Sequence, residues 1–158
     1  MRNNQSLKSL VAPFILVAAT CFNQASATDN PFQGNWAYQQ ICGLQHVASV
    51  RLQQKGSEVS GSWDDGSTRA SGTYGQLKGN VINGQLRVRY CGGDDSSDYS
   101  VCPNYEAEAS DYFVRQGKDL IWYKMTAEKS GNTFQKYLVL HPAIHGKPTI
   151  TDNHCPDN

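Results

Sequence analysis

The stretch EVSGSWDDGSTRASGTYGQLKGN, residues 58–80, contains a similar tripeptide twice: Gly61-Ser62-Trp63 and, eleven positions later, Gly72-Thr73-Tyr74. In each copy the glycine and the aromatic residue are two positions apart, so both point to the same face of a β-strand. A glycine leaves room where a strand bends sharply, and small barrels need such bends. The repeat therefore predicts two neighbouring strands of a small β-barrel.

The alternation of apolar and polar residues continues after this stretch. Between Val81 and Tyr90, the apolar residues Ile82, Leu86 and Val88 share one face and polar residues share the other, which is typical of a half-buried strand. Glycines recur throughout the chain, and long stretches with helical periodicity are absent. We therefore expect an all-β protein. The predicted strands lie near residues 34–42, 46–55, 58–64, 68–76, 80–91, 104–116, 119–128 and 132–141.

Turn-forming residues occupy the links between these strands, among them Lys55-Gly56-Ser57, Asp65-Gly66, Lys78-Gly79-Asn80 and Gly117-Lys118. Eight consecutive strands with short turns most simply form an antiparallel up-and-down meander. Closing the meander into a barrel removes its exposed edges. The predicted fold is thus a single small β-barrel over residues 28–158, with an irregular tail from about residue 142.

The N-terminus has the pattern of a secretory signal peptide. Arg2 and Lys8 precede an apolar run, and Ala25-Ser26-Ala27 is a small-x-small cleavage site, so we expect residues 1–27 to be removed. The apolar run is too short for a membrane span. Lipidation at Cys21 is an open alternative, although the preceding VAAT is a poor match to the bacterial lipoprotein pattern. The predicted location is periplasmic or secreted.

Charge limits the classes of partner. The full chain has 14 basic and 14 acidic residues, so removal of Arg2 and Lys8 leaves a net charge of about −2. Nucleic-acid binding needs a basic footprint and is not expected.

Four cysteines remain after cleavage, an even number that favours two disulfides in an oxidising compartment. In an up-and-down meander Cys42, Cys91 and Cys102 lie at one end of the barrel, and Cys91 and Cys102 flank a single loop. We predict a Cys91–Cys102 bridge and, by elimination, a Cys42–Cys155 bridge. A zinc site is the alternative, but no two cysteines have the spacing of a zinc finger.

Residues 32–38, FQGNWAY, resemble the Gly-x-Trp opening of lipocalin-like and avidin-like barrels, and residues 51–63 are similar to their second and third strands. The resemblance implies that Trp36 closes one end of the barrel. Lipocalins also have a late arginine that packs on this tryptophan, and this chain has no arginine after Arg115. The biotin-binding pattern of avidin is not recognisable, so the resemblance concerns the fold and no ligand is transferred.

The predicted strand faces give the barrel an aromatic interior, which an eight-stranded barrel can fill or keep open for one small ligand. The expected interior residues are Trp36, Tyr38, Val50, Leu52, Trp63, Tyr74, Leu86, Val88, Phe113, Tyr123, Phe134, Leu138 and Leu140.

Motifs that indicate catalysis are missing: neither Gly-x-Ser-x-Gly nor His-Glu-x-x-His occurs. Glu106 and Glu108 share one face of a predicted strand, but apolar residues on the opposite face indicate that both glutamates are solvated. His141 and His145 are four residues apart, with His154 further along, and we interpret them as exposed histidines of the tail rather than metal ligands. We expect no enzyme activity, cofactor or metal.

The strand directions place acidic loops at the cysteine end of the barrel, whereas Lys55, Lys78 and Lys118 are expected at the opposite end. An acidic mouth attracts cationic partners and speeds encounter. The predicted binding residues are Asp64, Asp65, Asp94, Asp95, Asp98 and Tyr99.

Three functions are compatible with the sequence. The first is a non-enzymatic exported binding protein, for a small apolar ligand or for a protein such as a cationic envelope protein. The second is an inhibitor or immunity protein against an envelope-directed toxin such as a lysozyme-like hydrolase. The third is a small hydrolase without a recognisable motif.

Overall fold

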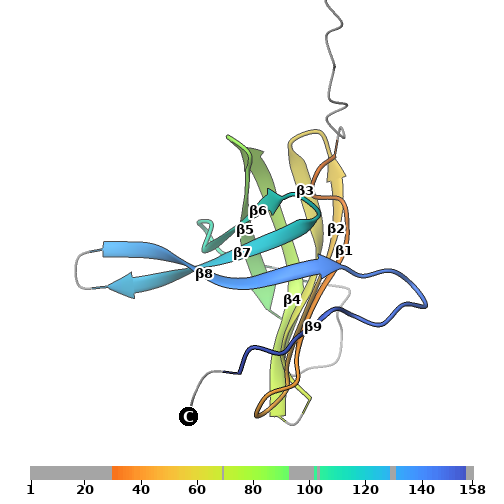
Figure 1. Cartoon of the computed structure of the whole chain (residues 1–158). Coiled ribbons are helices and arrows are strands. Elements are labelled where there is room, and N and C mark those ends of the chain that lie inside the picture. The colour runs from red at the N-terminus through yellow and green to blue at the C-terminus, as the bar shows by residue number, and fades with distance from the viewer. Residues whose placement is uncertain (1–29, 69, 93–101, 103, 129–130, 156–158) are drawn as a thin grey trace, which may run out of the picture.

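The computed structural model describes residues 30–68, 70–92, 102, 104–128 and 131–155 (Figure 1). These residues form nine strands and no helix. The described part of the chain therefore contains no helix that could cross a membrane. The strands are β1 (Gly34–Gln40), β2 (His46–Lys55), β3 (Glu58–Ser67), β4 (Ala70–Ile82), β5 (Gln85–Gly92), β6 (Asp111–Gln116), β7 (Asp119–Glu128), β8 (Gly131–Pro142) and β9 (Thr151–Asp152).

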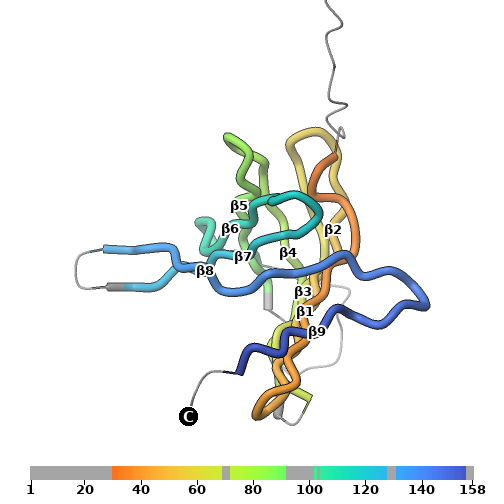
Figure 2. The backbone as a smooth tube through the Cα atoms, viewed as in Figure 1, coloured from red at the N-terminus to blue at the C-terminus, as the bar shows by residue number. Residues whose placement is uncertain are grey.

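Strands β1 to β8 pair with their neighbours in chain order, all antiparallel. β1 also pairs with β8, through Trp36 opposite Pro142 and Ala37 opposite His141, and this contact closes the barrel. Figure 2 shows the chain winding around the barrel, with the far half of the β7–β8 hairpin projecting from it. The predicted closed antiparallel meander of eight strands is confirmed.

The tail after β8 returns to the barrel. It leaves at Pro142 and comes back to place Thr151 and Asp152 beside Gln39 and Gln40 of β1, in parallel, as β9. The Cys42–Cys155 disulfide fixes this end of the tail. The second disulfide joins Cys91 and Cys102, so both predicted bridges are confirmed.

One contiguous apolar cluster occupies the barrel interior. Most of the predicted interior residues belong to it, and Trp63 packs against it. Three predictions are wrong: Tyr74, Tyr123 and Phe134 are not in the core. Residues that the sequence patterns did not identify replace them. These are Phe32, Ala48, Val59, Leu77, Leu120 and Trp122.

The predicted strand over residues 80–91 is wrong, because it contains a tight turn. Asn83 and Gly84 both have positive φ angles, 51° and 76°, which is the geometry of a type I′ hairpin turn. The turn reverses the chain, so that Ile82 pairs with Gln85 and is exposed. The predicted turn at Lys78-Gly79-Asn80 instead lies within β4.

Two further boundaries differ from the prediction. The expected turn at Asp65-Gly66 is part of β3, where Asp65 is opposite Ala48 of β2. The strand expected over residues 104–116 begins only at Asp111. Glu106 and Glu108 therefore precede the strand. Glu106 Oε2 accepts hydrogen bonds from the Tyr90 amide, at 3.0 Å, and from the Ser110 hydroxyl, at 2.6 Å.

Trp36 is buried at one end of the barrel, as the family resemblance implies. Its indole nitrogen donates a hydrogen bond to the Phe32 carbonyl at 3.1 Å. The Arg115 guanidinium lies 4.5 Å from the centre of the ring. Arg115 of β6 thus makes a cation–π contact with Trp36, although the chain has no arginine at the later position from which lipocalins supply theirs.

Glycine at position 79 is required by the close approach of β5. A Cβ atom at Gly79 would overlap the Arg87 carbonyl oxygen, which as backbone has little freedom to move. We expect Gly79→Ala to lower the free energy of unfolding by about 1–3 kcal/mol, the usual cost of overpacking. Ser60→Ala, at an exposed position of the neighbouring strand β3, is the control and should change it by less than about 0.5 kcal/mol. Urea unfolding measures both, and equal stability of the two variants would contradict this prediction.

Candidate functional site

A charged cluster lies inside one end of the barrel. Asp65 of β3 is at its centre, with a side chain that is 7% exposed. His46 Nε2 lies 2.6 Å from one carboxylate oxygen, and Lys124 Nζ donates to the other at 2.7 Å. The Tyr137 hydroxyl also donates, with distances of 3.1 and 2.9 Å to the two oxygens. These four residues are called the Asp65 cluster below.

An irregularity in β8 brings Tyr137 into this cluster. Trp122 pairs with Leu138 and Tyr123 pairs with Lys136, so Tyr137 is an extra residue in the β7–β8 ladder. Its ring meets Trp122 edge-on, with 5.3 Å between ring centres. Such a bulge redirects one side chain, and a period-two pattern does not reveal it. Tyr137 therefore cannot be recognised as a member of the cluster from the sequence alternation alone.

Asp65 remains ionised inside the barrel. Burial alone would raise the pKa of this carboxyl, but hydrogen bonds from His46, Lys124 and Tyr137, together with the positive charge of Lys124, lower it below its usual value. The same arrangement raises the pKa of the Tyr137 hydroxyl well above its usual value, through burial and the negative charge of Asp65. Tyr137 thus stays protonated and serves as a donor.

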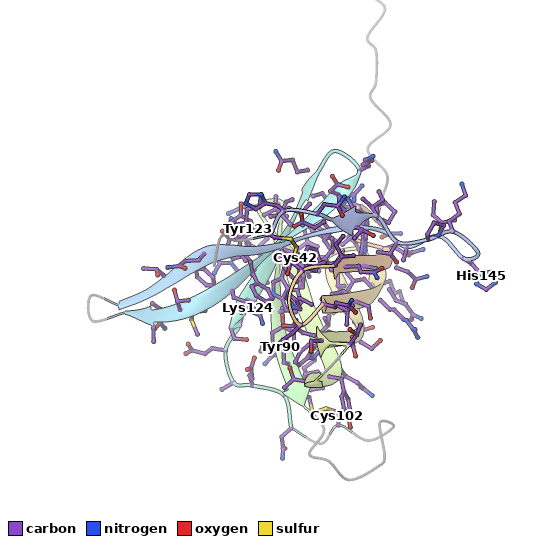
Figure 3. The ribbon with its side chains drawn as sticks, turned by 60° about the horizontal axis from the view of Figure 1, so that its bottom comes forward. Cys42, Tyr90, Cys102, Tyr123, Lys124 and His145 are labelled. Carbon is purple, nitrogen blue, oxygen red and sulfur yellow. A yellow bond between two sulfur atoms is a disulfide. The ribbon has the colours of Figure 1, made fainter. Side chains whose placement is uncertain are left out.

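A second buried carboxylate, Asp111 of β6, lies nearby. Its oxygens accept hydrogen bonds from the Trp122 indole at 2.7 Å, the Tyr90 hydroxyl at 2.9 Å and the Met125 amide at 3.2 Å. Burial raises the pKa of Asp111 above its usual value despite these donors. Figure 3 shows Lys124 and Tyr90, one from each group, in the middle of the molecule.

Both carboxylates bond to donors of the barrel itself, as buried polar groups require. Together they link β2, β3 and the strands β5 to β8 at this end, and both aspartates are buried, so neither carboxylate is open to a ligand. The Trp63 indole nitrogen differs: it is buried and has no hydrogen-bond partner among the described residues. We interpret the two carboxylate groups as the internal support of the site rather than its binding surface.

The predicted acidic mouth is only partly within the described residues. Asp64 is exposed on the outer face of β3, whereas Asp65 points inward to Lys124. Asp94, Asp95, Asp98 and Tyr99 lie outside the described residues, in the segment that the Cys91–Cys102 disulfide closes. A cationic partner at this segment stays a prediction.

A cleft opens beside the Asp65 cluster, where β8 separates from β1. Its volume is about 610 Å³, and residues 136–139 of β8 and 151–153 of the tail form its two sides. Tyr38 lies between them and donates a hydrogen bond to Asp152 at 3.2 Å. Burial and the negative charge of Asp152 raise the pKa of Tyr38 to about 12, so this hydroxyl is a donor at neutral pH.

One edge of β8 faces this cleft and has no neighbouring strand over part of its length. β8 pairs with β7 on one side, but it meets β1 only from His141 onward. Within the described ranges, no strand pairs with the second side over residues 134–140. Such an edge presents amide and carbonyl groups at strand spacing and can accept another strand.

Aromatic residues, of which Tyr112 and Tyr123 are half-buried and Phe134 is exposed, lie on the outer face next to this edge. Tyr112 and Tyr123 stack with 4.6 Å between ring centres, and Phe134 meets Tyr112 edge-on at 5.0 Å. Phe134 is 37% exposed, as is Met125 opposite it on the projecting hairpin. Tyr123 and Phe134, expected in the core, thus belong to this outer aromatic group.

The histidines do not gather. His141 Nδ1 lies 2.8 Å from an oxygen of Asp119, and His145 lies on the tail loop, far from the barrel centre (Figure 3). The His154 amide donates to Asp152. Where the structure describes the chain, no three His, Cys, Asp or Glu side chains are close enough together to hold a metal ion.

Comparison of the chain with protein-family models, with curated proteins and with solved structures finds no match. The geometry of the cleft and of the β8 edge is therefore the basis for the functional proposal.

Proposed function

We propose that this protein is an exported, non-enzymatic binding protein that holds an extended segment of a partner protein against the free edge of β8. The observation that carries the proposal is the edge of β8 over residues 134–140, which has no neighbouring strand among the described residues and lies beside a cleft of about 610 Å³. Export is supported by the N-terminal signal pattern and by two disulfides, which are typical of oxidising compartments. Inhibition of an envelope-directed hydrolase is one form that this function can take.

Side chains beside the edge specify the segment. Phe134 and Lys136 are two residues apart and point outward from β8, next to Met125 and Tyr123 of β7. An added strand would place its outward side chains beside Phe134 and Lys136. Cross-strand pairs are stabilising when both side chains are apolar or when the two carry opposite charges. The segment should thus carry an apolar residue and, two positions away, an acidic residue.

The other functions have less support in the geometry. A small apolar ligand would need space in the barrel, but the interior holds a continuous cluster that includes the fully buried Trp122 and Phe113. A hydrolase would need an activated nucleophile, but the hydroxyl beside the His46–Asp65 pair belongs to Tyr137, whose high pKa keeps it protonated. A lipocalin-like or avidin-like relationship is compatible with the closed barrel and with Trp36, and we propose it for the fold only.

Selection of displayed random peptides on the mature protein tests the proposal. We expect selected peptides to have alternating patterns with an apolar and an acidic residue two positions apart. Bound peptide should slow hydrogen exchange of amides in residues 134–140, because added-strand hydrogen bonds protect them. Phe134→Ala should weaken binding at least about tenfold, as expected for loss of an aromatic anchor.

Ile82→Ala is the matched control, since Ile82 is an exposed apolar residue at the β4–β5 turn. It should change the affinity by less than about twofold. Peptides that protect other strands, or that bind the two variants equally, would refute strand addition at β8.

A further inference from the structure

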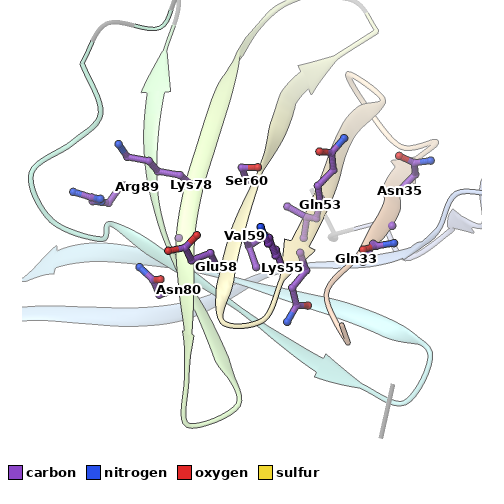
Figure 4. A pocket seen from close by; sticks show the side chains of 14 residues that line it. Gln33, Asn35, Gln53, Lys55, Glu58, Val59, Ser60, Lys78, Asn80 and Arg89 are labelled. Carbon is purple, nitrogen blue, oxygen red and sulfur yellow. The ribbon is translucent and has the colours of Figure 1, made fainter. Parts of the chain in front are cut away.

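A row of polar side chains crosses the outer face of β2 to β5. Strand register aligns Gln53 with Ser60, Ser60 with Lys78, and Lys78 with Arg89. Figure 4 shows this row along a groove of about 1000 Å³, which Asn35 and Gln33 of the β1 segment border at one end. The groove lies on the outer face of these strands and does not include the β8 edge.

Two cations face each other in this row. Lys78 and Arg89 are directly opposite on β4 and β5, and like charges in such a pair repel each other. In the described part of the chain neither side chain forms an ion pair with a carboxylate. Lys78 Nζ lies 4.0 Å from the centre of the Tyr105 ring, which holds it by a cation–π contact. The pair thus presents two positive charges that no carboxylate of the described residues neutralises.

Neighbouring rows extend the positive charge. Lys55, Glu58, Asn80 and Arg87 are aligned in the next row, and Arg51 lies on the other side. Glu58 is the acidic residue that lines the groove, against Lys55, Lys78 and Arg89. Because the whole chain has equal numbers of basic and acidic residues, this excess is a local property of the face.

We propose that this groove binds an anionic polysaccharide. Lys78 and Arg89 would pair with carboxylate or sulfate groups, which a guanidinium can bind through two parallel hydrogen bonds. The amides of Asn35, Gln53 and Asn80 supply donors and acceptors for sugar hydroxyls. The proposal is independent of strand addition at β8, because the two sites share no residue.

Binding of a sulfated probe, heparin, and a carboxylated probe, polygalacturonate, to the full mature chain tests this inference by calorimetry. The double variant Lys78→Gln/Arg89→Gln should bind at least about tenfold more weakly and with a smaller dependence on salt, because two charge contacts are lost. Lys118→Gln/Lys147→Gln removes the same charge elsewhere and should change the affinity less than about twofold.

The double variant should remain folded, because it removes a repulsive pair together with the Lys78–Tyr105 contact, and its melting temperature should stay within a few degrees of that of the wild type. Equal weakening in the two double variants, or no measurable binding of either polysaccharide, would overturn the site. Tighter binding to vesicles that contain anionic phospholipid than to either polysaccharide would overturn the assignment of the ligand.

Discussion

Asp65→Ala is expected to lower the free energy of unfolding by about 2–3 kcal/mol, because the Lys124 ammonium, the His46 imidazole and the Tyr137 hydroxyl, all partly exposed at the barrel end, lose their shared acceptor. The adjacent Asp64 provides a matched control, since its side chain is exposed on the outer face. Asp64→Ala removes the same charge and should cost less than about 0.5 kcal/mol. Equal effects of the two substitutions in urea unfolding would contradict the assigned role.

The pH dependence of the free energy of unfolding tests whether the ionised carboxylate of Asp65 is responsible for this effect. The folded state lowers the pKa of Asp65, so its contribution is present above the usual value of 3.8 and is lost as the pH falls through the folded pKa. The stability difference between wild type and Asp65→Ala should therefore shrink below about pH 4. The pH dependence of the Asp111 contribution has the opposite sign. Folding raises the pKa of Asp111, so its contribution to stability grows as the pH falls through the folded pKa toward 3.8. A constant difference between wild type and Asp65→Ala from about pH 7 to pH 3 would refute this assignment.

Removal of the Cys42–Cys155 bridge is the second large effect. The two cysteines are 113 positions apart, and a cross-link over a loop of this length stabilises by about 5 kcal/mol. Cys42→Ser/Cys155→Ser should lower stability by this amount. It should also release β9, so that the amides of Gln39 and Gln40 exchange faster with solvent.

The second disulfide supplies the control. Cys91 and Cys102 are 11 positions apart, which gives an expected stabilisation of about 3 kcal/mol. Cys91→Ser/Cys102→Ser should leave the exchange of Gln39 and Gln40 under native conditions unchanged, because this bridge does not touch the tail. Fast exchange of these amides in both variants would mean that the tail depends on overall stability rather than on its own bridge.

The closed meander could be predicted because it depends on features that repeat along the chain: alternation, regular turns and an even number of cysteines. The β4–β5 turn shows the limit of this pattern. Apolar residues alternate on both sides of Asn83-Gly84, so the alternation alone reads as one strand, although Asn-Gly is the strongest short hairpin signal. Giving that dipeptide priority over the alternation would have placed the turn correctly.

The binding site was less predictable because its parts are distant in sequence. Asp65 was interpreted as part of an exposed mouth, since nothing near it in the chain indicates that Lys124, 59 positions away, neutralises it. The free edge of β8 depends on where the last strand separates from the first, which no local pattern encodes. The sequence pattern places Lys78 in a turn and Arg89 in the strand that follows, whereas the turn at Asn83 in the structure puts the two residues opposite each other.

The closure of the barrel by its first and last long strands determines the order in which the chain can fold. Trp36 and Pro142 pair across 106 positions, so β1 has no partner on this side until nearly the whole chain has been delivered. Contacts of such long range are slow to form and leave strand edges exposed to aggregation in the meantime. Cys91 and Cys102 can oxidise as soon as their own loop emerges, whereas Cys42 meets Cys155 in register only after closure. The ratio of the two bridges in a refolding sample would therefore report how far barrel assembly has progressed on average.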